Sequence, residues 1–361
     1  MKRIPHQTLF ASIGAAVLVF ACAPATAAQK HKNQEPKSQV LPLPPELPRA
    51  LLADTNTLDF HISPLLKVGG LSAQIHQSLN DLIRDTHGET IIKMRAFVAG
   101  AGDARRVQAQ TAEIFTDRKL PLPTLTILQV GALGQEGAQV VIEAVVSTRK
   151  NVNASGLAFF AGQNGDSFNQ ALQQLRNSVS AASVAPEHIL TSTCFISQIS
   201  DYESARAAIQ SAFPNTAINV VQAVREPVND AGMCEAVGQL SEPPAAGPVV
   251  LLKKSRATLV NSRQLIFTGL QLSFGSFLDD AHEAFVRLRR TAAALQPIAA
   301  PVEVNAFTLD AYASSALRKT ASFPPSAFTV QTVEGLPAID ASGGIEAILA
   351  PGVPSAVSVA R

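Results

Sequence analysis

Apolar residues recur with helical and then strand-like spacing along the first folded segment. Leu71, Ile75, Leu79 and Leu82 follow Gly69-Gly70 at helical spacing and predict an amphipathic helix. Asp103 is a suitable N-cap for a second helix that reaches Phe115. Apolar runs predict three strands, at Ile91–Val98, Leu125–Val130 and Ala138–Val146.

The same order of elements is clearest between Phe160 and Val237. A strand and turn, Phe160-Ala161-Gly162-Gln163, precedes two helices and the strands Thr191–Phe195 and Met233–Val237. Ser167-x-x-Gln170 and Ser200-x-x-Glu203 have the form of capping boxes and predict where the two helices begin.

A third segment repeats the pattern. Its predicted elements are a strand and turn at Gln264–Gly269, a helix from Ser276, a strand at Val302–Thr308, a helix at Asp310–Phe323 and strands at Ala327–Val333 and Gly343–Leu349. The segment therefore predicts the order β-α-β-α-β-β, which gives an α+β unit with helices on one face of a sheet.

Two anchors recur in the three segments. A middle strand ends in Phe97, Phe195 and Phe307, and a last strand carries Glu143, Glu235 and Glu346. The Phe spacings are 195 − 97 = 98 and 307 − 195 = 112, and the Glu spacings are 235 − 143 = 92 and 346 − 235 = 111. Agreement at both anchors predicts true repeats. The predicted boundaries are 55–149, 150–246 and 247–350, with a tail at 351–361.

The N-terminus has the pattern of an export signal. Lys2 and Arg3 precede an apolar run, and Ala25-Thr26-Ala27 is an A-x-A cleavage site, so residues 1–27 are predicted to be a signal peptide. Residues 28–54 are a Pro-rich tether. We expect a periplasmic or secreted protein, with lipidation at Cys22 as an open alternative that alone would bring it to a membrane.

The repeat pattern resembles one subunit of the RidA/YjgF family of small trimeric imine deaminases. The resemblance implies that this chain, which the N-terminal pattern predicts to be exported, has three tandem, divergent, RidA-like (chorismate-mutase-like) repeats that form a single-chain pseudo-trimer. It also implies ligand clefts between repeats, where a family arginine binds the substrate carboxylate. In this chain that position falls on Leu125, Ile218 and Ala327, so none of the repeats keeps the arginine.

Other family positions survive, and the resemblance makes them candidates for ligand binding. They are the turn residues Gly162 and Gln163 and the strand residue Thr193. Arg206 stands where the family has asparagine. It has two interpretations, a rebuilt anion site or a solvated helix residue.

Glu143, Glu235 and Glu346 are the candidate catalytic residues. Each lies among apolar neighbours on a strand, where an unpaired carboxylate is costly. Two roles stay open: a structural one, with hydrogen bonds at a repeat junction, and a ligand-site or general-base one. Cys194 and Cys234 likewise have two interpretations, as buried free thiols or as a disulfide. A disulfide requires their Cα atoms to lie within about 7 Å of each other.

Composition and motifs narrow the function. The 361-residue chain has a formal charge of +1 and no basic cluster, so we expect no nucleic-acid partner. It has no nucleophile elbow, zincin or phosphate-loop motif and no spaced histidine pair, so no metal or cofactor is predicted. The expected function is monomeric small-molecule binding or a scaffold role, for an unknown ligand. The alternative is a divergent deaminase or hydrolase that acts on a non-carboxylate ligand.

Overall fold

The computed structural model describes residues 44–100, 102–225, 231–275, 278–295, 299–321, 327–352 and 358–359. The predicted signal peptide (residues 1–27), Cys22, most of the predicted tether and most of the predicted tail lie outside the described residues. Residues from Pro44 onward belong to one compact unit. In this described part, no helix has both the length and the apolar character needed to cross a membrane.

The first sheet of the described chain has four strands, in the order β2 (Leu58–Ile62), β6 (Val140–Ser147), β3 (Thr90–Ala99) and β4 (Thr124–Val130). The strand β3 is antiparallel to β6 and parallel to β4. A parallel pair needs a crossover connection, which the helix α2 (Arg105–Asp117) supplies. Helix α1 (Leu71–Asp85) packs beside α2 and buries the apolar stripe predicted from its spacing.

The second sheet has eight described strands, in the order β18 (Ser358–Val359), β11 (Val249–Leu252), β12 (Ala257–Val260), β7 (Leu157–Gly165), β10 (Gly232–Gln239), β8 (Ile189–Ile196), β9 (Ala217–Gln222) and β5 (Ala132–Leu133). Helix α3 (Phe168–Ala181) packs on β7 and β10, and helix α4 (Tyr202–Ala212) connects the parallel pair β8 and β9. The Ser167 side chain accepts a hydrogen bond from the Gln170 amide, which confirms the predicted cap of α3. The Ser200 cap is wrong, because a 3₁₀ turn at Ile199–Asp201 leads into α4 and no side chain caps it.

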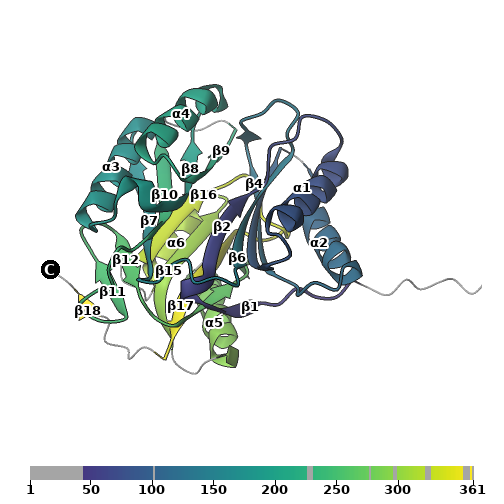
Figure 1. Cartoon of the computed structure of the whole chain (residues 1–361). Coiled ribbons are helices and arrows are strands. Elements are labelled where there is room, and N and C mark those ends of the chain that lie inside the picture. Colours follow the sequence, from purple (N-terminus) through teal and green to yellow (C-terminus); the bar gives the residue numbers. More distant parts are fainter. Residues whose placement is uncertain are drawn as a thin grey trace, which may run out of the picture. The chain divides into compact units, whose positions relative to one another are not determined.

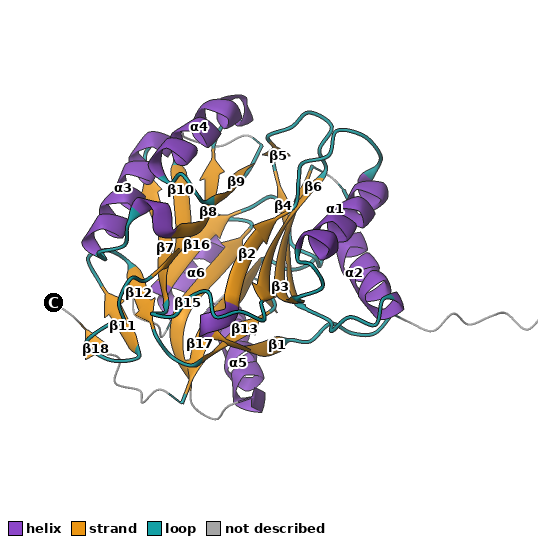
Figure 2. Cartoon of the chain, viewed as in Figure 1, coloured by secondary structure: helices purple, strands orange, loops and turns teal. Residues whose placement is uncertain are grey.

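The third sheet has six described strands. Five follow the order β1 (Ala50–Asp54), β13 (Gln264–Thr268), β17 (Gly343–Pro351), β15 (Ala299–Thr308) and β16 (Phe328–Thr332), and β14 (Gln271–Ser273) also pairs with β17. Helix α5 (Leu278–Leu295) packs against β17, and helix α6 (Ala311–Thr320) connects the parallel strands β15 and β16. In each sheet the helices cover one face, so the helices lie outside and the strands inside (Figure 1, Figure 2).

The faces of the sheets that carry no helices are lined by alternate residues of the central strands. Phe97, Phe195 and Phe307 meet in one apolar cluster. A second apolar cluster contains Leu58 and Phe267, and it also joins all three sheets. Charged and polar side chains from the same strand faces lie between these two clusters, and they form the candidate site described below.

The predicted fold class is wrong. We expected an α+β chain of three RidA-like (chorismate-mutase-like) β-α-β-α-β-β repeats in a pseudo-trimer, but the structure is a mixed α/β arrangement of three unequal sheets. Each sheet contains a parallel pair joined by a helix, and edge strands cross the expected boundaries. The strand β1, from the predicted tether, pairs with β13, while the β11–β12 hairpin joins β7 and the short strand β5 joins β9. An exposed strand edge pairs with whichever segment reaches it, and spacing along the sequence does not reveal that segment.

Candidate functional site

The three predicted glutamates occupy the same cross-strand position in three different sheets. Glu143 pairs with Arg95 across β6 and β3, Glu235 pairs with Thr193 across β10 and β8, and Glu346 pairs with Asn305 across β17 and β15. A partner on a neighbouring strand points to the same face of its sheet. All six side chains therefore point toward the interior, where the sheets meet.

Arg95 is the centre of this cluster. Its Nε donates to Glu143 Oε2 at 2.7 Å, one terminal nitrogen donates to Glu235 Oε1 at 2.5 Å, and the other lies 3.4 Å from Glu346 Oε1. The guanidinium also lies over the Phe97 ring, 5.4 Å from its centroid. Burial would lower the pKa of Arg95, but the three carboxylates raise it well above its ordinary value. One arginine therefore joins the three sheets through charge-assisted hydrogen bonds.

Lys93 is bonded by protein groups on every side. Its ammonium donates to the hydroxyl of Thr126, to the carbonyl of Thr268 at 2.5 Å and to the carboxylate of Glu346. An ammonium has three N–H donors, so these bonds use all of them. Burial lowers the pKa of Lys93, while Lys93 and Arg95 together hold the pKa of Glu346 below its ordinary value against the effect of burial. Lys93 is thus a structural cation with no donor left for a ligand.

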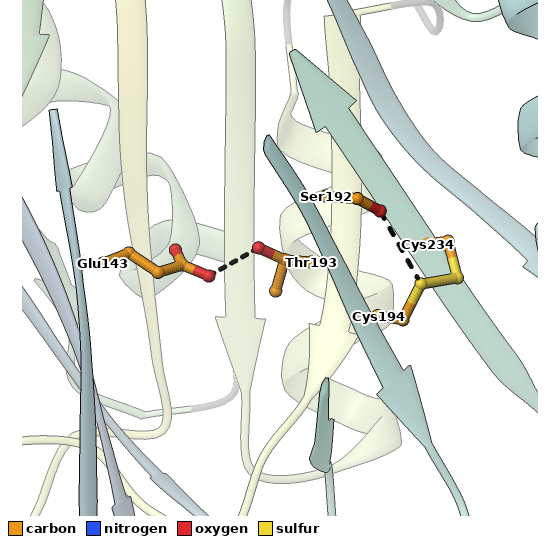
Figure 3. The surroundings of a disulfide bond; sticks show 5 residues. All are labelled: Glu143, Ser192, Thr193, Cys194 and Cys234. Atoms are coloured by element: carbon orange, nitrogen blue, oxygen red, sulfur yellow. Dashed lines mark hydrogen bonds between the residues drawn. A yellow bond between two sulfur atoms is a disulfide. The ribbon is translucent and has the colours of Figure 1, made fainter. Parts of the chain in front are cut away.

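Glu143 is also saturated by neighbouring donors. Besides Arg95, it accepts from the Thr193 hydroxyl at 2.5 Å and from the Asn219 amide at 2.6 Å. Figure 3 shows the Thr193 side chain pointing toward Glu143 across the space between two sheets. Of the three glutamates, Glu143 and Glu346 thus match the structural interpretation, because each has several partners.

Glu235 and Glu303 differ from these two carboxyls. Arg95 is the ion-pair partner of Glu235, and Glu303 has a side-chain hydrogen bond with Asn305. Burial raises the pKa of Glu235, although Arg95 opposes this, and burial together with the Glu235 charge raises the pKa of Glu303 well above its ordinary value. The pair is therefore a protonatable unit on the inner face of β10 and β15.

Asn305 lies next to this pair of carboxyls, with a side-chain hydrogen bond to Glu303. The residue is 6% exposed, and its Oδ1 is buried without a hydrogen-bond partner. Buried polar atoms in native proteins are nearly always satisfied. Asn305 Oδ1 is therefore an acceptor that is open to a molecule bound in this space.

The space is a cavity of about 90 Å³. Its polar floor is formed by the cluster around Arg95, and its wall is apolar and includes Phe60, Val145, Val237, Phe267 and Ile348. Part of this lining is partly exposed, including Phe60, Val145 and Ile348, so the cavity opens at that end.

His61 also lines the open end, and its Nε2 lies 3.4 Å from Asp59 Oδ2. The contact with Asp59 raises the pKa of His61 and lowers that of Asp59. Among the described residues, no group of three or more His, Cys, Asp or Glu side chains is arranged to hold a metal ion.

The other predicted ligand-binding residues lie apart, and only Thr193 lines the cavity. Leu125 lies in a separate groove of about 230 Å³ beside Leu270. The Gly162 amide donates to the Thr329 hydroxyl at 2.7 Å, and the Gln163 amide donates to its own strand and to Ser255. Arg206 is exposed on α4, Ile218 packs against the core under α3 and α4, and Ala327 is buried beside β16.

Sequence reasoning missed Lys93, Arg95, Glu303 and Asn305. A usable signal was present, because these residues occupy alternate positions of otherwise apolar strands. Counting back from the Phe anchors, Arg95 and Asn305 lie two residues before Phe97 and Phe307, and Lys93 and Glu303 lie two further back. Alternation of this kind places all four on the interior face.

Cys194 and Cys234 form a disulfide, with Cα atoms 4.2 Å apart. They are direct cross-strand partners in β8 and β10 and belong to the core under α3 and α4. Figure 3 shows this bridge on the side of β8 opposite to the Thr193 side chain. The bridge therefore ties together the two strands that carry Thr193 and Glu235.

No protein-family model and no curated protein matches this chain. Among solved structures, it is similar to a chorismatase at 10% identity and a TM-score of 0.24, covering 82% of this chain and 99% of that chain. It is also similar to a cyanuric acid hydrolase at 12% identity and a TM-score of 0.24, covering 82% of this chain and 100% of that chain. A cyanuric acid hydrolase from A. caulinodans matches at 11% identity and a TM-score of 0.22, covering 84% of this chain and 100% of that chain. None of the three is a RidA protein, and likeness at this level transfers no activity to this chain.

Proposed function

We propose that the chain is a small-molecule-binding protein and that the cavity around Arg95 is its site. The observation that carries the proposal is the unpartnered Asn305 Oδ1 inside a buried, lined cavity. A buried acceptor left unsatisfied costs about 1–3 kcal/mol. A ligand that donates a hydrogen bond removes this cost when it binds.

The proposed ligand is not a carboxylate. The cations of the cluster are committed to protein groups, since Lys93 uses all three donors and Arg95 pairs with three carboxylates. The groups left for a ligand are the acceptor Asn305 Oδ1 and the carboxyls of Glu235 and Glu303. A ligand carboxylate would meet these without a free cation, and it would also shed its hydration.

The experiment is a thermal-shift screen of a metabolite library against the purified protein. A ligand that binds only the native state raises the melting temperature by mass action. The matched variant is Val145→Phe, which fills the partly exposed mouth of the cavity. We expect library hits to stabilise the wild type and to lose their effect in the variant. Hits that stabilise both proteins equally would place the binding site elsewhere and refute the proposal.

A hydrolase or deaminase acting on a non-carboxylate ligand is the alternative function. It is favoured by Glu303, which burial and the Glu235 charge keep protonated above the ordinary pKa of a glutamate, beside a second carboxyl. General acid–base catalysis often uses two carboxyl groups of unequal pKa, one as the acid and one as the base. Incubation of each library hit with the protein tests this alternative, with product detected by mass spectrometry and Glu303→Gln as the inactive control.

We also propose that the protein is exported. The support is the Cys194–Cys234 disulfide, because such bonds persist in oxidising compartments such as the periplasm. Fractionation of cells that express the full-length chain, followed by N-terminal sequencing of the mature protein, tests this. Retention of an uncleaved chain in the cytoplasm would refute it.

A further inference from the structure

We propose that the ligand of the central cavity is a small organic cation, an ammonium or amidinium group with a short apolar tail. This inference rests on the proposed small-molecule function and adds the chemical class of the ligand. It follows from three features of the cavity: its unbalanced carboxyls, its unpartnered acceptor and its apolar mouth.

The first feature is an excess of carboxyl groups. Among the described lining residues, Lys93 and Arg95 face Glu143, Glu235, Glu303 and Glu346. Glu143 and Glu346 have several donors each, and they balance the two cations. Glu235 shares Arg95 with the other two glutamates, and Glu303 has no ion-pair partner among the described residues. Ionising the buried Glu303 carboxyl without a cation is costly, and Glu235 has only a share of Arg95, so this pair is complementary to a positive charge.

The second feature is the pattern of hydrogen-bond acceptors. Glu235 lies on β10 and Glu303 and Asn305 lie on β15, in two different sheets, and all three side chains line the cavity. Ammonium and amidinium groups carry several N–H donors and no acceptor, as the side chains of Lys and Arg do. A cation of this kind can donate a hydrogen bond to the unpartnered Asn305 Oδ1 and neutralise a carboxylate when it binds.

The third feature is the wall between the acidic floor and solvent. Val145, Val237 and Ile348 lie two residues after the glutamates on β6, β10 and β17, and Phe60 and Phe267 face the same space. Apolar walls with a few placed polar groups are typical of small-ligand sites. Aromatic rings near a cation add a further attraction. The arrangement therefore fits a charged head in the floor and an apolar tail that points to the mouth.

Two shape-matched ligand sets of differing charge test the inference by isothermal titration calorimetry and thermal shift. One set is benzamidine, benzamide and benzoate, and the other is butylamine, butanol and butyrate. Within each set the shape is similar and the charge changes from positive to neutral to negative. We expect the cation of at least one set to bind at least about tenfold more tightly than its neutral and anionic relatives.

Variants separate the proposed site from general attraction of cations. Glu303→Gln and Glu235→Gln each remove a carboxylate from the pair, and each should weaken cation binding at least about tenfold. Glu113→Gln removes the charge of an exposed residue on α2 and should leave binding unchanged. If Glu235→Gln fails to fold, Glu303→Gln and the mouth variant Val145→Phe still decide the outcome.

Affinity should also rise with pH as Glu303 ionises. The charged or titratable groups that face it are Glu235 of β10, Lys93 and Arg95 of β3, Glu143 of β6, Glu346 of β17 and, at the mouth, His61 of β2. Binding that is independent of pH in the wild type, or unchanged in Glu303→Gln, would overturn the inference.

The outcomes distinguish this inference from the proposed function. If the neutral member of a set binds best, the ligand is not a cation, yet small-molecule binding in the cavity stands. Preferred binding of benzoate or butyrate would overturn this inference and also the statement that the ligand is not a carboxylate. If no member binds, the inference is wrong, and the library screen decides the proposed function independently.

Discussion

The variant Arg95→Met tests how strongly one side chain holds the three sheets together. Methionine keeps an apolar stem beside Phe97 but removes every donor that Arg95 offers. Glu143 keeps its bonds from Thr193 and Asn219, and Glu346 keeps Lys93 and Thr126. The main loss falls on Glu235, whose ion-pair partner is Arg95.

The expected loss follows from that distribution of partners. Removing one member of a buried ion pair costs about 3–5 kcal/mol, because a charge is left buried without compensation. We therefore expect Arg95→Met to lower the free energy of unfolding by about 3–5 kcal/mol near neutral pH. The double variant Arg95→Met/Glu235→Gln should recover about 1–3 kcal/mol of this, because it removes the uncompensated charge.

Urea unfolding followed by far-UV circular dichroism measures these changes, since the chain contains no tryptophan for fluorescence. The control is Arg105→Met on α2, where the solvent-exposed pair with Asp103 should leave the urea midpoint nearly unchanged. The reasoning fails if Arg95→Met stays within about 0.5 kcal/mol of the wild type. It also fails if the double variant is less stable than Arg95→Met alone.

Three further predictions concern Glu303, the disulfide and the hydrolysis of 2-iminoacids. The pKa of Glu303 in the folded state is raised above 4.5, the ordinary value for a glutamate, so the folded chain binds more protons than the unfolded chain and its stability falls as the pH rises from about 4.5 through the folded pKa. Relative to the wild type, Glu303→Gln should therefore be more stable at about pH 8 than at about pH 5 in urea titrations, and an unchanged difference would contradict this. Removing the disulfide, which joins cysteines 40 residues apart, with the double variant Cys194→Ala/Cys234→Ala should lower the free energy of unfolding by about 2–4 kcal/mol, and an equal urea midpoint would contradict it. The protein should not hydrolyse 2-iminoacids made in situ by an amino-acid oxidase, because Lys93 and Arg95, the cations of the cavity, are already paired with protein groups and leave no cation for the substrate carboxylate; clear suppression of the semicarbazide-trapped product would refute this.

Local elements were predictable because their signals lie within short stretches of sequence. The apolar spacing of α1 and the Ser167 cap of α3 depend on residues at most a few turns apart. The strand predicted at Ile91–Val98 corresponds to β3, Thr90–Ala99. The Ser200 cap failed because a 3₁₀ turn competes with helix initiation there.

The sheet arrangement was not predictable because it depends on which segments reach an open edge. The strand β1 lies in a segment whose proline content favoured a tether, yet it pairs with β13 more than 200 positions later, as in the Ala50–Thr268 register. Strand pairing at such separation leaves no periodic signal in the chain. The disulfide is a similar case, because it depends on the cross-strand register of β8 and β10.

The candidate site was half predictable. Recurrence and the resemblance to the family's strand glutamate identified Glu143, Glu235 and Glu346, and the structure brings all three to Arg95. The sequence carried no sign that Arg95 would serve three sheets at once, since its contacts to Glu235 and Glu346 span 140 and 251 residues. The sparsely partnered pair of Glu235 and Glu303 became visible only when the partners of every other carboxyl were known.

The most direct test of the central claim is calorimetric titration of the strongest library hit into the wild type and into Val145→Phe. The account predicts one binding site per chain in the wild type and at least about tenfold weaker binding in the variant, because the added ring occupies the mouth of the cavity. Equal affinity and stoichiometry in the two proteins would contradict it and would show that the cavity around Arg95 is not the ligand site.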